Sequence, residues 1–239
     1  MKKLFVLALT AFLLAACGGG DTPDSLVKQA MREAEKTVPQ EEFSHLGTLP
    51  VLWAKHDEAK KQLSAMISER KEKADEKFKK GGSMEDRIRS SMIIEDLEKA
   101  SKTELERIFK ERITAEATKL DGQSVPVDFD KGAFSDAKVT IHLSKDTSIY
   151  YPIVYDVDLT LAAPLRSKKS WWSWTYIEWE SRDKNNEVLE YYIFGSQHLD
   201  NIDDYKEGDH VTFEIRPDVR HTNMENPRAF EKLYFCKKE

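Results

Sequence analysis

The chain has 239 residues, of which 33% are charged, 40% are hydrophobic and 10% are aromatic, and its formal net charge is -6. This length suffices for one large domain or two small ones, and the hydrophobic content is too high for a disordered chain. The acidic balance excludes a nucleic-acid binder that works by neutralising phosphates, and a count of two cysteines excludes a disulfide-stapled scaffold.

The first twenty residues have the pattern of a secretory signal. Two lysines precede an uncharged apolar run, residues 4–14, which is too short to span a bilayer stably. Small residues then lead to a cysteine and three glycines. The ending Leu14-Ala15-Ala16-Cys17 resembles the lipobox of bacterial lipoprotein precursors, and this resemblance covers residues 1–20 only.

The resemblance implies that residues 1–16 are removed as a signal peptide and that Cys17 becomes acylated, for example with palmitate, at its thiol and new amino terminus. Residues 17–21 would then be the lipidated end and a short tether. Each buried methylene contributes ~0.8 kcal/mol, so two or more acyl chains hold a protein firmly on a membrane. Gly18 stands where an aspartate would indicate retention in the inner membrane, so we expect the outer membrane, facing either the periplasm or the exterior.

Residues 22–121 are predicted to be helical. Thr22 and Pro23 predict a helix start. The next apolar residues recur at spacings of three and four, namely Leu26, Val27, Ala30, Met31, Ala34 and Val38. A Pro- and Gly-containing connection, residues 39–50, ends this first helix.

A second helix is expected from Trp53 to Lys80, and a third opens at Ser83 and Asp86, which approximate a capping box. Gly81 and Gly82 form the turn between them, so the pair is predicted to be an antiparallel helical hairpin of the coiled-coil type. The apolar residues of the third helix are Ile88, Met92, Ile93, Leu97, Leu105, Ile108, Phe109 and Ile113. Residues 69–80 alternate in charge, which fits either a solvated, ion-paired helix end or a projecting spacer.

Residues 122–239 hold eighteen aromatic side chains, against four in residues 21–121, and their apolar residues alternate with period two. The clearest case is the run from Ile149 to Leu161, with Asp156, Asp158 and Thr160 on the opposite face. A hairpin turn is expected at 183–186 and a last strand at 230–236. About seven strands predict an antiparallel β-sandwich and hence an α+β protein, similar in architecture to immunoglobulin and fibronectin domains but without the immunoglobulin Cys–Trp–Cys pattern.

One predicted strand, residues 171–179, carries aromatic side chains on both faces, whereas a sandwich strand should have one polar face. Its partner, residues 188–194, repeats the feature. One face must therefore be covered by the helical half, by a protein partner or by a carbohydrate on which the rings stack. The candidate binding surface consists of Trp171, Trp172, Trp174, Tyr176, Trp179 and Tyr192.

No motif for catalysis or for a cofactor is present: the six histidines lack the HExxH spacing, and there is no GxSxG elbow, P-loop or GxGxxG. A weak candidate for calcium is the acidic loop with Asp200, Asp203 and Asp204, which lacks the EF-hand spacing. Cys236 is expected to be a small strand residue rather than a nucleophile.

These observations predict a membrane-anchored lipoprotein of the bacterial cell envelope, with no cofactor, whose body is a non-catalytic binding module for a protein or glycan. The alternatives are an envelope enzyme that acts on glycan or peptidoglycan, with a cleft of ionisable groups, and a purely structural envelope component.

Overall fold

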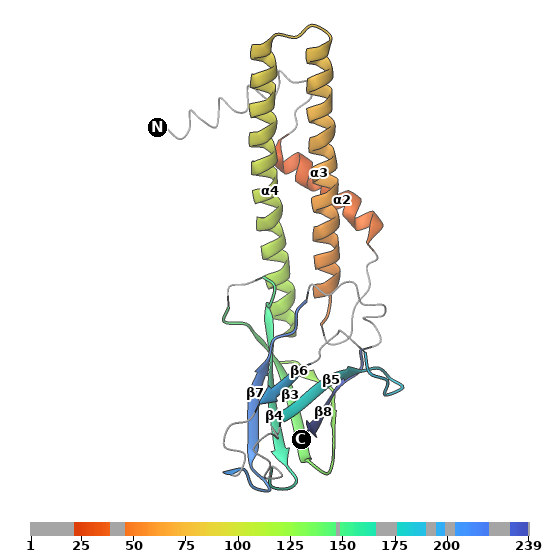
Figure 1. Cartoon of the computed structure of the whole chain (residues 1–239), viewed down its shortest axis with the longest axis vertical. Coiled ribbons are helices and arrows are strands. Elements are labelled where there is room, and N and C mark those ends of the chain that lie inside the picture. Colours follow the sequence, from red (N-terminus) through yellow and green to blue (C-terminus); the bar gives the residue numbers. More distant parts are fainter. Residues whose placement is uncertain are drawn as a thin grey trace. The chain divides into compact units, whose positions relative to one another are not determined.

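The structure is a computed structural model that describes residues 22–38, 46–146, 149–165, 176–189, 195–198, 204–219 and 230–238 (Figure 1). Within these residues three helices precede eight strands in two sheets, which confirms the α+β class. The chain divides into two compact units. The helical unit comprises residues 1–40 and 54–110, and the β unit comprises residues 41–53 and 111–239.

Helix α2 (Pro23–Thr37) begins where the sequence predicts. The Ser25 amide donates to Thr22 Oγ1 at 3.2 Å, and the Thr22 amide donates to Ser25 Oγ at 3.0 Å. Both bonds satisfy amides that have no partner within the helix. Pro23 lacks an amide hydrogen and therefore loses nothing in the first turn.

Helices α3 (Leu49–Lys79) and α4 (Met84–Leu120) form the predicted antiparallel hairpin (Figure 1). The chain reverses at Gly81, whose φ of 113° is a conformation that favours glycine. Ser83 Oγ then accepts from the Asp86 amide at 3.1 Å and caps α4.

The N-terminal end of α3 differs from the prediction. The helix begins at Leu49 rather than at Trp53, because Pro50 fits the first turn of a helix as well as it fits a loop. The end of α4 at Leu120 agrees with the predicted end of the helical region.

The helical unit has one apolar core, to which all three helices contribute. Nine of its residues are at most 7% exposed, and their positions on α2 repeat the predicted spacing. The nine are Leu26, Val27, Ala30, Ala34, Ala59, Leu63, Ile67, Leu97 and Leu105.

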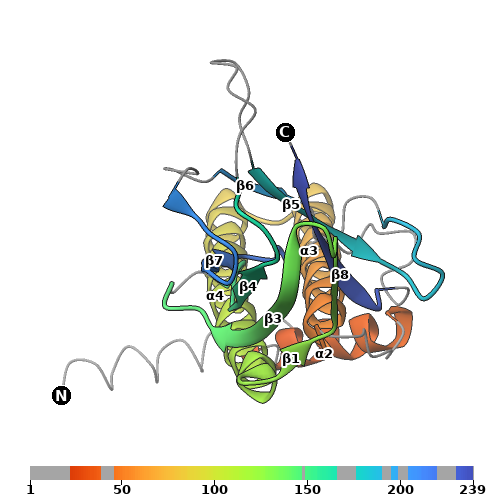
Figure 2. The same cartoon turned by 90° about the horizontal axis from the view of Figure 1, so that it is seen from below.

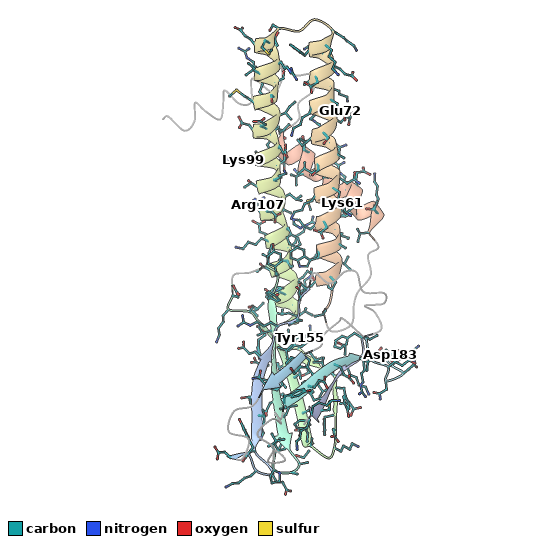
Figure 3. All side chains as sticks on the ribbon, viewed as in Figure 1. Lys61, Glu72, Lys99, Arg107, Tyr155 and Asp183 are labelled. Carbon is teal, nitrogen blue, oxygen red and sulfur yellow. The ribbon has the colours of Figure 1, made fainter. Side chains whose placement is uncertain are left out.

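Ion pairs line the charged part of the hairpin. Lys73 Nζ lies 2.5 Å from a Glu69 oxygen one turn away, and Lys71 of α3 lies 2.8 Å from Glu98 of α4. Side chains such as Glu72 stand along the exposed sides of the helices (Figure 3). These contacts favour the first of the two predicted alternatives, a solvated helix end stabilised by opposite charges.

The first sheet of the β unit is antiparallel, with the order β1–β3–β4–β7. Its strands are β1 (Ser124–Val125), β3 (Phe134–Leu143), β4 (Ile153–Leu161) and β7 (His210–Ile215). Alternate side chains of β4 are buried, as predicted.

Strand β4 begins at Ile153, four residues later than the predicted start of this run at Ile149. Pro152 has no amide hydrogen to give to the ladder, and it precedes the first strand residue. Its carbonyl still accepts from the Ser144 amide at 3.0 Å, so the two strands remain joined at this end.

The second sheet has the order β2–β8–β5–β6. Its strands are β2 (Val127–Phe129), β8 (Lys232–Lys238), β5 (Tyr176–Arg182) and β6 (Gly195–His198). β2 pairs with β8 in parallel, so the prediction of purely antiparallel sheets is wrong at this edge.

Pro126 lies where the chain changes sheets. It lies between β1, at the edge of the first sheet, and β2, at the edge of the second. Because proline cannot donate to a ladder, the chain can leave one sheet there and enter the other without breaking a hydrogen bond.

The predicted turn at 183–186 is confirmed. Asp183 Oδ1 accepts from the amides of Asn185 and Glu187 at 2.8 Å each, and Asn186 has a positive φ of 69°. β5 pairs antiparallel with β6, which lies beyond the predicted partner segment 188–194; residues 190–194 lie outside the described residues.

Aromatic side chains join the two sheets. The ring of Phe213 on β7 lies 5.3 Å from the ring of Trp179 on β5 and 6.3 Å from that of Phe235 on β8. Figure 2 shows β3, β4 and β7 on one side of the β unit and β5, β6 and β8 on the other. The fully buried Tyr155 belongs to the same unit (Figure 3).

Candidate functional site

Most of the predicted aromatic surface lies outside the described residues, namely Trp171, Trp172, Trp174 and Tyr192. The two described members lie on opposite faces of β5, as the alternation predicts. Tyr176 is half-buried, and Trp179 is 8% exposed. Trp179 therefore belongs to the core and does not offer a surface to a ligand.

The position of Trp179 depends on a glycine in the neighbouring strand. Gly195 pairs directly with Trp179, and a Cβ atom at Gly195 would lie 2.6 Å from Cζ2 of the indole. Real Cβ atoms do not approach carbon so closely, so the indole occupies the space above the glycine backbone. Trp179 is among the candidate surface residues because alternation in the sequence separates the two faces of a strand without indicating which face is inside.

The outer face of β5 and β8 is charged within the described residues. Glu178 lies 3.3 Å from Lys238, and Glu180 is paired with Arg182. The Arg182 guanidinium lies 3.5 Å above the ring of Tyr234, a cation–π contact. In this part of the sheet the outward-facing charged side chains are therefore engaged in contacts with neighbouring side chains.

The acidic loop proposed for calcium is only partly described. Asp200 and Asp203 lie outside the described residues, and Asp204 is exposed. In the described parts of the chain no group of three or more His, Cys, Asp or Glu side chains is placed to hold a metal ion.

The outer face of the first sheet is concave, with a cavity of about 440 Å³ lined by β3, β4 and β7. Asp156, at its centre, pairs across the strands with Glu214, so two carboxylates stand on adjacent strands. His142 Nε2 lies 3.5 Å from Asp156 and its Nδ1 lies 3.4 Å from Asp121. This arrangement suits cationic or hydroxyl-rich groups, since its oxygens are acceptors.

A histidine–aspartate pair continues along the same face. His210 Nδ1 lies 2.6 Å from Asp158, which is opposite Lys138 in the ladder. The sequence predicted the polar positions of β4, but it carried no signal that His142, His210 and Glu214 would join them. These residues are brought together by strand pairing between distant segments.

Three large apolar side chains of α4 are exposed to solvent. Met84 is 59%, Ile88 is 55% and Met92 is 61% exposed, which makes them the three most exposed large hydrophobic residues described. Ile88 and Met92 belong to the apolar pattern of the predicted helix, but both lie outside its buried core. At about 100° per residue they point away from the side of α4 that carries Leu97 and Leu105, which are buried.

One histidine of the helical unit is buried. His56 of α3 is 4% exposed, and its ring stacks on Phe109 of α4 with centroids 3.9 Å apart. Glu106 lies 3.4 Å from His56 Nε2 and 2.8 Å from Lys60. Burial, followed by the charge of Lys60, lowers the pKa of His56, while Glu106 opposes the shift.

Cys236 lies on β8 and is partly buried. Burial raises the pKa of its thiol, and its Sγ is 3.8 Å from Glu178 Oε2. A raised pKa disfavours the thiolate that a nucleophile needs.

No family model, curated protein or solved structure matches this chain. Among the described helices, none carries an apolar stretch of the length that crossing a bilayer requires.

Proposed function

We propose that this chain is a lipoprotein of a bacterial cell envelope, cleaved before Cys17 and anchored by acyl chains on that residue. The observation that carries the proposal is the order of its first residues: two lysines, an uncharged apolar run and Leu14-Ala15-Ala16-Cys17. Gly18 favours the outer membrane over the inner one.

The anchored body is proposed to be a non-catalytic binding module. Its β unit would be a two-layer β-sandwich, an idea supported by the ring contacts of Phe213 with both Trp179 and Phe235. The exposed apolar side chains of α4 support a binding role, since a soluble surface seldom keeps several large apolar residues together without a partner.

Acyl labelling tests the anchor. Cells fed a palmitate analogue should label the wild-type chain and leave Cys17→Ser unlabelled, and mass spectrometry should place the mature amino terminus at residue 17. Cys236→Ser is the matched control, because it removes the other cysteine and should leave the label unchanged. A label that persists in Cys17→Ser, or a mature terminus elsewhere, overturns the anchor assignment.

An envelope enzyme acting on glycan or peptidoglycan is the second candidate, and the concave face with Asp156 opposite Glu214 favours it. Two facing carboxylates are the groups that glycoside hydrolysis uses. The purified chain should be incubated with isolated cell-wall sacculi. Retention on the sacculi without soluble fragments supports a binding module, whereas fragments that disappear in Asp156→Asn and Glu214→Gln support an enzyme. If neither occurs, the role of a structural component without a glycan ligand is favoured.

A further inference from the structure

The exposed apolar residues of α4 form a single row. Met84, Ile88 and Met92 are four residues apart, so their side chains follow one another along one side of the helix. Residues at this spacing make the ridge that packs into the groove of another helix. Counting about 100° per residue, Ile88 and Met92 point away from Leu97 and Leu105, and none of the three row residues is a member of the helical core.

The residues before and after the row differ in charge. Lys79 and Lys80 precede it at the turn of the hairpin, and Glu95 and Asp96 follow Met92. All four side chains are exposed. Reversing one copy would therefore bring the two lysines of that copy near the two carboxylates of another.

We propose that two copies of this chain pair antiparallel through α4, with Ile88 at the twofold axis. Met84 then faces the partner's Met92, and Lys80 lies near the partner's Asp96. The outer side of the hairpin, where Lys99 stands (Figure 3), would lie beside this contact.

Three side chains make a small contact compared with the ~800 Å² that each partner of a stable complex buries. Pairing is therefore weak between free copies and strong between copies confined to one membrane, where the effective concentration is high. The stronger pairing of membrane-bound copies rests on the proposed anchoring at Cys17. The geometry of the contact does not depend on that anchoring.

An anionic membrane fits the row less well. Glu85 stands beside Met84 and Ile88 on α4, and Glu95 and Asp96 lie directly beyond Met92. Acidic side chains on both margins repel anionic headgroups, while a second copy of the hairpin offers lysines to the same acidic end.

Cysteine cross-linking tests the pairing. In full-length Cys236→Ser, each new cysteine is oxidised mildly in cells, and dimers are measured on non-reducing gels. Ile88→Cys should give several-fold more dimer than Arg89→Cys, an exposed neighbour about one quarter-turn away. Met84→Cys and Met92→Cys should each dimerise poorly alone but cross-link to one another when co-expressed.

The same variants can also be purified and oxidised at increasing protein concentration. This experiment tests the pairing independently of the proposed anchor at Cys17. If Cys17 is not acylated, the parent chain shows thiol-dependent dimers through Cys17, yet Ile88→Cys still exceeds Arg89→Cys in concentrated solution. Lys79→Glu with Lys80→Glu should reduce the Ile88→Cys dimer several-fold, and adding Glu95→Lys with Asp96→Lys should restore it.

Three results overturn the pairing: equal dimer from Ile88→Cys and Arg89→Cys in folded protein, strong dimers of Met84→Cys and Met92→Cys alone, or an Ile88→Cys adduct to a different protein. Sedimentation with vesicles of phosphatidylglycerol that is lost in Ile88→Ser would assign the row to a membrane instead.

Discussion

In the helical unit the backbone hydrogen bonds join residues close in the chain, whereas in the β unit the strand ladders join residues far apart. Glu69 meets Lys73 one helical turn away, but Val127 pairs with Leu233 across most of the β unit. An aromatic side chain that points into the β unit is therefore structural. An apolar side chain on the outer side of α4 contributes nothing to its own unit's core, and for that reason it is the better guide to a partner.

The largest expected loss of stability comes from a substitution in the core of the β unit. Phe235 is fully buried against Phe213, so Phe235→Ala should lower the free energy of unfolding by about 3–5 kcal/mol. All five tryptophans belong to the β unit, so their fluorescence reports its unfolding, while circular dichroism at helical wavelengths follows the helices.

Leu63→Ala is the matched variant in the helical core, where Leu63 is 1% exposed. It should lower the free energy of unfolding measured from the helical signal by about 2–5 kcal/mol. The free energy measured from tryptophan fluorescence should fall by less. If each variant shifts both unfolding transitions equally, the two units unfold together. The contrast between their stabilities then does not hold.

A smaller loss of stability is expected from a substitution at Gly195, which lies against the indole of Trp179. Gly195→Ala places a Cβ atom 2.6 Å from Trp179 Cζ2, and such overpacking should cost about 1–3 kcal/mol. Urea titration measures the loss, and a red shift of tryptophan emission would show that the indole has moved toward water. Ser196→Ala, at the next and exposed position of β6, should change neither quantity.

The buried histidine should make the helical unit sensitive to acid. Because the pKa of His56 is lower in the folded than in the unfolded chain, the unfolded chain binds more protons between the two values. The free energy of unfolding should thus fall as pH decreases below about 6.5, the ordinary histidine pKa. His56→Phe should flatten the dependence of Tm on pH from about pH 7.5 to about pH 5.5.

The control for His56 is His142→Gln, because His142 is only partly buried and lies in the other unit. An unchanged slope of Tm against pH in His56→Phe would mean that another group is responsible for the acid sensitivity.

The smallest effect concerns the ion pairs of the hairpin. Glu98 accepts from Lys102 at 2.6 Å and from Lys71 at 2.8 Å, and these bonds hold the pKa of its carboxyl below its usual range. Glu98→Gln should lower the free energy of unfolding by less than about 1 kcal/mol. High salt should remove the difference from wild type, and Glu72→Gln (Figure 3), on an exposed side of α3, should show less.

Local signals in the sequence predicted the helices well. Thr22 and Pro23 start α2, Gly81 turns the hairpin and Ser83 caps α4, because each acts through backbone groups within four residues. In the same way Asp183 and Asn186 define a turn that depends only on neighbouring amides.

Candidate sites were predicted less well, for a different reason. Ile88, a member of the apolar helical pattern, is exposed, whereas Trp179, a member of the candidate binding surface, is buried. Apolar periodicity shows which side chains share a face, but burial depends on what packs against that face. The carboxylates Asp156 and Glu214 had no shared signal, since they are 58 positions apart in the numbering and meet only through strand pairing.

The sequence by itself determined the class of the fold, the order of helices and strands, and the signal on which Cys17 is proposed as the anchor. Those properties depend on contacts within a few residues, or on a linear motif that a processing enzyme would meet as an extended chain. The tertiary structure decided the parallel edge at Val127, the burial of Trp179 and the exposure of Met84, Ile88 and Met92. Each depends on which distant segments become neighbours, and that is set by the packing of the whole unit.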